Sequence, residues 1–107
     1  MMYDSTTKIG FDDRVLAHLE VVIVSKLRRK ESFALTWREP LENGSGRSTV
    51  WLDVAIPLRF RFEGGRAPSL DRHWIEQLSI SAASSTGLVV VDQHGESVYG
   101  TTHERGI

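Results

Sequence analysis

The longest helical pattern in the chain runs from Asp12 to Lys30, and it limits what the other residues can form. Apolar side chains recur about every four positions and form one broad stripe (Val15, Leu16, Leu19, Val22, Ile23 and Leu27). Asp12 and Asp13 place negative charge at the start of the helix, and three basic residues end it, as the helix dipole favours. A helix with one broad apolar face is the kind that covers a sheet.

Short segments with alternating polarity predict the strands of that sheet. Residues 32–38 and 48–53 alternate between apolar and polar side chains, and the glycine-rich stretch 42–47 separates them, which predicts a hairpin with a long loop. Residues 58–62 alternate in the same way, with Arg59 and Arg61 on the outward side. The first eleven residues predict a short hairpin around a polar turn.

A second helix is predicted from about Asp71 to Ala83. Ser69 or Asp71 can cap its start, and its apolar face consists of residues at helical spacing (Trp74, Ile75, Leu78 and Ala82). Residues 88–91 are a continuous apolar run, which we expect to be a strand buried on both faces. The chain after Gln93 is polar, and we expect a tail that is mobile unless a neighbour holds it.

Together these elements predict an α+β fold of two layers. The expected order is β-hairpin, α, three strands in a meander, α and β, with one mostly antiparallel sheet and both helices packed on one face. We expect residues 1–92 to form a single domain and residues 93–107 to form a polar C-terminal tail. The expected common core consists of inward-facing residues from both helices and the third predicted strand (Leu19, Ile23, Leu27, Phe60, Trp74 and Leu78).

Composition restricts the compartment and the chemistry. The chain has no cysteine, which excludes disulfides, thiolate metal sites and cysteine nucleophiles. No apolar run approaches the about 20 residues of a membrane span, and the first residues lack the pattern of a secretory signal. We therefore expect a cytoplasmic protein without a membrane partner.

The candidate catalytic residues all have a simpler structural interpretation. No two histidines have the i, i+4 spacing of a helical metal pair, and all four are interpreted as surface residues (His18, His73, His94 and His103). Asp12 and Asp13 are interpreted as helix caps, no serine lies in a GxSxG motif, and Gly44–Arg47 lacks the spacing of a phosphate loop. The sequence thus predicts no catalytic residue, no metal site, no cofactor and no enzyme.

Basic residues concentrate in the middle of the chain. Between Lys26 and Arg72 there are ten basic and six acidic residues. The arginines that we expect on an exposed sheet face or its loop are the candidates for nucleic-acid or anion binding (Arg38, Arg47, Arg59 and Arg61). Charged residues on the solvent face of an antiparallel sheet are also normal, so both interpretations stay open.

Trp51 is the candidate for a protein partner surface. The alternation places it on the sheet face opposite to Phe33, Leu35 and Trp37, a face that two helices on the other side cannot cover. If it is exposed beside Val54, the patch is a candidate surface for a dimer or another partner.

Several phrases in a fixed order resemble a known family of small proteins. They are found at residues 13–19, 26–29, 31–33, 44–48, 51–52, 56–60 and 74–76, and the resemblance covers about Lys8 to Val91. The family is common in actinobacteria, has no established function, and its members often carry the automatic label "ATP-dependent DNA ligase". No lysine here precedes x-Asp-Gly, the motif that a ligase adenylates, so the resemblance implies at most an accessory to nucleic-acid enzymes.

The sequence therefore predicts a small cytoplasmic binding or adaptor module that is not an enzyme. We expect it to act through its sheet face and loops on an unknown protein partner or on a second copy of itself. The alternative is a nucleic-acid-binding accessory protein.

Overall fold

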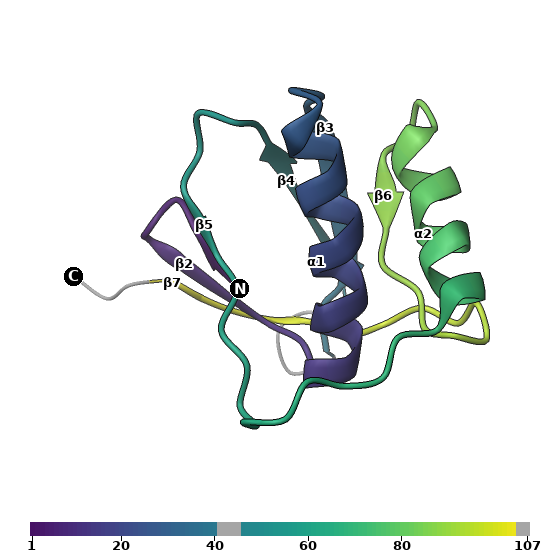
Figure 1. Cartoon of the computed structure of the whole chain (residues 1–107). Coiled ribbons are helices and arrows are strands. Elements are labelled where there is room, and N and C mark those ends of the chain that lie inside the picture. The colour runs from purple at the N-terminus through teal and green to yellow at the C-terminus, as the bar shows by residue number, and fades with distance from the viewer. Residues whose placement is uncertain (41–45, 105–107) are drawn as a thin grey trace.

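The computed structural model describes residues 1–40 and 46–104, and this part of the chain contains two helices and seven strands (Figure 1). The predicted α+β class is confirmed. In chain order the elements are β1 (Met2–Tyr3), β2 (Thr7–Gly10), α1 (Asp13–Arg28), β3 (Phe33–Arg38), β4 (Arg47–Leu52), β5 (Leu58–Arg59), α2 (Arg72–Ala83), β6 (Leu88–Val89) and β7 (Thr101–Glu104).

The strands form two sheets where a single sheet was expected. One sheet has the order β4-β3-β6, and the two helices lie in front of it in Figure 1. The other has the order β5-β1-β2-β7 and lies beside α1. Strands β3 and β4 form the predicted antiparallel hairpin, and so do β1 and β2, whereas β6 runs parallel to β3.

The predicted meander of three strands is wrong, because β5 does not return to β4. A turn follows β4, in which the backbone N–H of Ile56 donates to the carbonyl of Asp53 at 3.0 Å and that of Ala55 donates to the Asp53 carboxylate at 2.9 Å. The carbonyl of Pro57 then accepts from the N–H of Asp4 at 2.9 Å, and β5 pairs with β1. The turn thus directs the chain into the N-terminal hairpin.

Helix α1 begins at the two aspartates, which have different partners. The Asp12 carboxylate caps the helix by accepting from the N–H of Val15 at 2.9 Å. The Asp13 carboxylate accepts from the N–H groups of Glu63 and Gly64, both at 2.8 Å. The second aspartate therefore fastens the loop after β5 to the helix.

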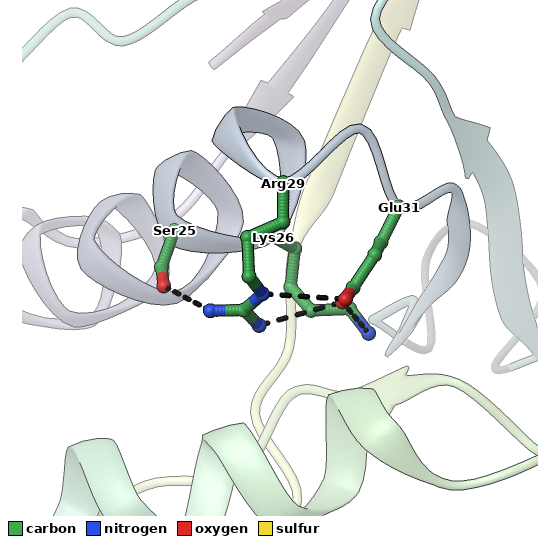
Figure 2. A network of polar contacts seen from close by, with 4 residues as sticks. All are labelled: Ser25, Lys26, Arg29 and Glu31. Atoms are coloured by element: carbon green, nitrogen blue, oxygen red, sulfur yellow. Dashed lines mark hydrogen bonds and ion pairs between the residues drawn. The ribbon is translucent and has the colours of Figure 1, made fainter.

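Helix α1 ends in a Schellman motif that is closed by a charged network. The N–H of Glu31 donates to the carbonyl of Lys26 at 3.1 Å, and Lys30 takes the left-handed conformation with φ 60°. Figure 2 shows the Glu31 carboxylate between Lys26, at 2.9 Å, and Arg29, which also donates to Ser25 at 3.0 Å. Hydrogen bonds from Arg29 and Lys26 lower the pKa of Glu31. Part of the basic helix end is thus neutralised within the protein.

The core lies between the helices and the β4-β3-β6 sheet. Leu19, Ile23, Trp74 and Leu78 are buried there, as expected, together with the inward residues of β3. Leu27 and Phe60, the other two predicted core residues, are half-buried against the same cluster.

His18 lies in this interior, so the prediction of a surface histidine is wrong for this residue. Its ring is fully buried and stacks on Trp74, with the ring centroids 4.0 Å apart. The ring Nε2 accepts from the N–H of Asp71 at 2.8 Å, which leaves Nδ1–H to donate to the carbonyl of Arg14 at 2.7 Å. Helix α2 packs against the side of α1 and therefore covers His18, which borders the apolar stripe of α1.

We expect His18→Phe to lower the free energy of unfolding by about 2 kcal/mol. Phenylalanine keeps an aromatic ring against Trp74 but leaves the Asp71 N–H without its acceptor, at the residue that caps α2. Urea denaturation followed by circular dichroism measures the change. His73→Phe is the control, since His73 is exposed; an equal loss in both variants would contradict a specific role for the buried ring.

The C-terminal part differs from expectation in two ways. In the run 88–91, Leu88 and Val90 are buried but Val89 is 39% exposed, so the prediction of a strand buried on both faces is wrong. The helices cover one side of β6, and its other side faces solvent. Residues 101–104 of the expected tail form β7, which pairs antiparallel with β2, so β2 is the neighbour that holds them.

Candidate functional site

The outer face of the β4-β3-β6 sheet, on the side opposite to the helices, carries the candidate residues. Along β3 and β4 alternate side chains point away from the core, as the alternation predicts. The outer face consists of these residues and one residue of β6 (Ala34, Thr36, Arg38, Arg47, Thr49, Trp51 and Val89).

Arg38 and Arg47 lie directly opposite each other across the hairpin. The N–H of Glu39 donates to the carbonyl of Gly46 at 2.8 Å, so the arginines form a pair that does not exchange backbone hydrogen bonds, the type with the closer side chains. Like charges in this position destabilise a sheet. Neither arginine has an ion pair with an acidic residue in the described part of the chain. An anion between them would relieve the repulsion.

A depression adjoins this arginine pair. It has a volume of about 460 Å³, and its walls include Thr36, Val89 and Ser97 as well as the two arginines. The Arg38 guanidinium lies over the ring of Tyr99, 5.4 Å from the centroid, and this tyrosine is 55% exposed. Sequence analysis did not single out Tyr99, because it lies in the segment expected to be a tail.

Arg59 and Arg61, the other two predicted arginines, are in a different part of the fold. Arg59 belongs to β5 in the second sheet, and Arg61 follows that strand. Both are exposed, as the alternation predicted. The structure thus brings together Arg38 and Arg47 but not all four on one sheet. Residues 42–45 of the predicted glycine-rich loop lie outside the described residues.

Trp51 lies at the other end of the outer face and is 55% exposed. It lies four positions after Arg47 along β4, which corresponds to about 13 Å at about 3.3 Å per residue. Its carbonyl accepts from the Tyr3 hydroxyl at 2.8 Å, which fixes this end of β4 to the second sheet. Val54, three positions further along the chain, is also exposed.

Glu39 is a buried carboxylate that sequence analysis missed. Its Oε2 accepts from Trp37 Nε1 at 3.0 Å, from Ser48 Oγ at 2.7 Å and from Thr102 Oγ1 at 2.6 Å. These donors lie on β3, β4 and β7, so one carboxylate connects both sheets. The sequence contained a signal for this burial, because Glu39 continues the inward alternation of Phe33, Leu35 and Trp37. The neighbouring Pro40, however, indicated only that the strand ends there.

A second depression near α2 is lined by polar groups that hold turns. Asp92 Oδ1 accepts from the N–H groups of His94 and Glu96, at 2.8 and 2.9 Å, and these bonds lower the pKa of Asp92. The Ser81 hydroxyl donates to the carbonyl of Gly87 and accepts from the N–H of Val89. Within residues 1–40 and 46–104 no group of three histidine or acidic side chains is placed to hold a metal ion.

The comparisons with known proteins identify the family. The model of a domain of unknown function, DUF7882, matches residues 1–93. The chain belongs to this family. The DUF7882 domain therefore includes both helices, the outer face of β4-β3-β6 and strand β2, whereas β7 lies beyond the matched residues. Neither the curated proteins nor the solved structures contain a match to the chain.

In the part of the chain with described positions, neither helix has the length and apolar character needed to cross a bilayer.

Proposed function

We propose that this DUF7882 protein is a cytoplasmic, non-enzymatic binding module that acts through the outer face of the β4-β3-β6 sheet. The observation that carries the proposal is the combination of an exposed arginine pair and an exposed tryptophan on one sheet face that the helices leave open. Surface tryptophan and arginine are the residues that contribute most to binding energy in protein interfaces. The partner is another protein or a second copy of the chain.

Single-stranded nucleic acid is the second candidate ligand. The like-charged pair Arg38 and Arg47 supports it, because a phosphate between the two guanidinium groups would neutralise a repulsion that the sheet otherwise tolerates. Trp51, about 13 Å away on the same face, offers a ring on which a base can stack. The actinobacterial resemblance and its ligase label add nothing to this candidate, since the ligase motif is missing from the sequence.

Fluorescence anisotropy with labelled single-stranded oligonucleotides tests the second candidate. Two neutralised phosphates predict a slope of log K against log salt of about −1.4, at about 0.7 per contact for single strands. Arg38→Gln combined with Arg47→Gln should bring the slope close to zero. Arg59→Gln combined with Arg61→Gln is the matched control, because both residues are exposed arginines of the other sheet region.

If the control substitutions at Arg59 and Arg61 changed the salt slope equally, the arginines would act only through the overall charge of the protein. Absence of binding at low salt would remove nucleic acid as the ligand. A pull-down from the native cell, with and without nuclease, then tests the first candidate: Trp51→Ser should abolish capture of a nuclease-resistant partner. Unchanged capture would exclude the outer face as the binding surface.

A further inference from the structure

Residues 98–104 form an extended segment that connects the two sheets. The N–H of Arg38 donates to the carbonyl of Val98 at 3.2 Å, and the N–H of Gly100 donates to the carbonyl of Arg38 at 2.8 Å. The segment then continues as β7 along β2. In Figure 1 it runs from the loop below α2 past the lower end of α1 to β2. It therefore fills a groove between the end of β3 and the edge of β2.

Two alternate positions of the segment face into this groove. A Cβ atom on Gly100 would lie 2.6 Å from Trp37 Cδ1 and 2.8 Å from Phe11 Cε1, so no other residue fits there without displacing the rings. Two residues later, Thr102 Oγ1 donates to Glu39 Oε2 at 2.6 Å. The residues between and beside them, Tyr99, Thr101 and His103, are exposed. The groove thus selects glycine at position 100 and threonine at position 102, whereas any residue fits at position 101.

This arrangement matches the way in which proteins bind extended peptides by strand addition. Main-chain hydrogen bonds to an exposed edge give affinity, and pockets for alternate side chains give specificity. The family match ends at residue 93, so the walls of the groove belong to the DUF7882 domain and the segment in it does not. The connection between them, residues 93–97, is exposed and forms a turn in which the N–H of Asp92 donates to the carbonyl of Glu96 at 2.8 Å.

We propose that this groove is a strand-acceptor site whose partner is residues 98–104 of a second copy of the chain. Within one molecule the groove is filled by its own segment. Exchange between two copies preserves every contact at Gly100 and Thr102 and requires only that the turn at Asp92 opens. Exchange of an identical element between copies is a low-cost route to a dimer. The site adjoins the outer face, because Arg38 bonds to Val98 and Gly100 through its backbone and its guanidinium lies over Tyr99.

Cross-linking of two single-cysteine proteins tests the exchange, because the natural chain has no cysteine. Lys8 and His103 are exposed cross-strand partners on β2 and β7, and such partners have Cβ atoms about 5 Å apart. Lys8→Cys protein and His103→Cys protein, mixed at high concentration, gently warmed and oxidised, should form a disulfide between positions 8 and 103 of different molecules. Mass spectrometry of the digested dimer identifies the link.

The control mixture pairs Lys8→Cys with Gln93→Cys, an exposed residue before the segment that has no partner on β2. This mixture should not yield the corresponding link. A peptide of residues 97–104 should compete with the exchange, whereas peptides with Gly100→Val or Thr102→Val should compete about tenfold less well. Absence of the link between positions 8 and 103, or a link of equal yield in the control mixture, would overturn the proposal.

Discussion

Ile23→Ala is expected to lower the free energy of unfolding by about 2–5 kcal/mol. Ile23 is fully buried in the cluster that joins α1, α2 and the inner face of the β4-β3-β6 sheet. Truncation removes apolar contacts and leaves a cavity that the close-packed surroundings fill only in part. Native domains are stable by only about 5–15 kcal/mol, so the loss is a large share of the total. Chemical denaturation with a tryptophan fluorescence signal measures it.

Val21→Ala is the matched control for this substitution. Val21 lies on the same helix two residues earlier and is 37% exposed, so its truncation should change stability by at most about 0.5 kcal/mol. A small effect at Ile23, or a comparable effect at Val21, would show that the helices do not share this core.

Glu39→Ala is expected to lower the free energy of unfolding by about 3 kcal/mol. Three donors would lose their acceptor, and the indole N–H of Trp37 is buried, so it could not bond to water instead. A buried donor that is left without a partner carries the full desolvation cost of its N–H or O–H group. Because the carboxylate connects β3 and β4 to β7, the variant should also expose β7 to faster amide exchange.

Two comparisons separate this role from a general effect of charge. Glu96→Ala removes an exposed carboxylate and should be nearly neutral. In a double-mutant cycle, Thr102→Val should cost less in the Glu39→Ala background than in the natural protein, because the shared hydrogen bond is already absent. Additive losses would contradict a direct contribution of that bond.

Local signals in the sequence were sufficient for the helices and the hairpins. Asp12 and Asp71 cap their helices as expected, and the alternation of residues 33–38 assigned the faces of β3 correctly. The pairing of β5 with β1 could not be predicted in this way. It depends on a turn at Asp53 and on a backbone contact between Asp4 and Pro57, which are far apart in sequence and carry no periodic pattern.

The candidate site also combines features that local signals predict with features that depend on long-range contacts. The polarity pattern placed Arg38 on the outward side of its strand. Arg47 was expected in the glycine-rich loop, but it begins β4, where the hairpin register pairs it with Arg38. The position of Tyr99 beside Arg38 depends on a long-range contact of the C-terminal segment, for which composition suggested only a polar tail. His18 and Glu39 are polar residues whose burial results from partners on other elements, so their own sequence neighbourhood gave little indication of their role.

The register of β7 on β2 also has a consequence for how the chain folds during synthesis. Thr7 pairs with Glu104, so the two strands that meet are separated by nearly the whole chain. Translation proceeds at about 5–20 residues per second, so β2 leaves the ribosome several seconds before β7. During that interval the strand edge and Trp37 lack their cover, and closing so long a loop is slow. The nascent protein is therefore most exposed to aggregation in the seconds before β7 emerges.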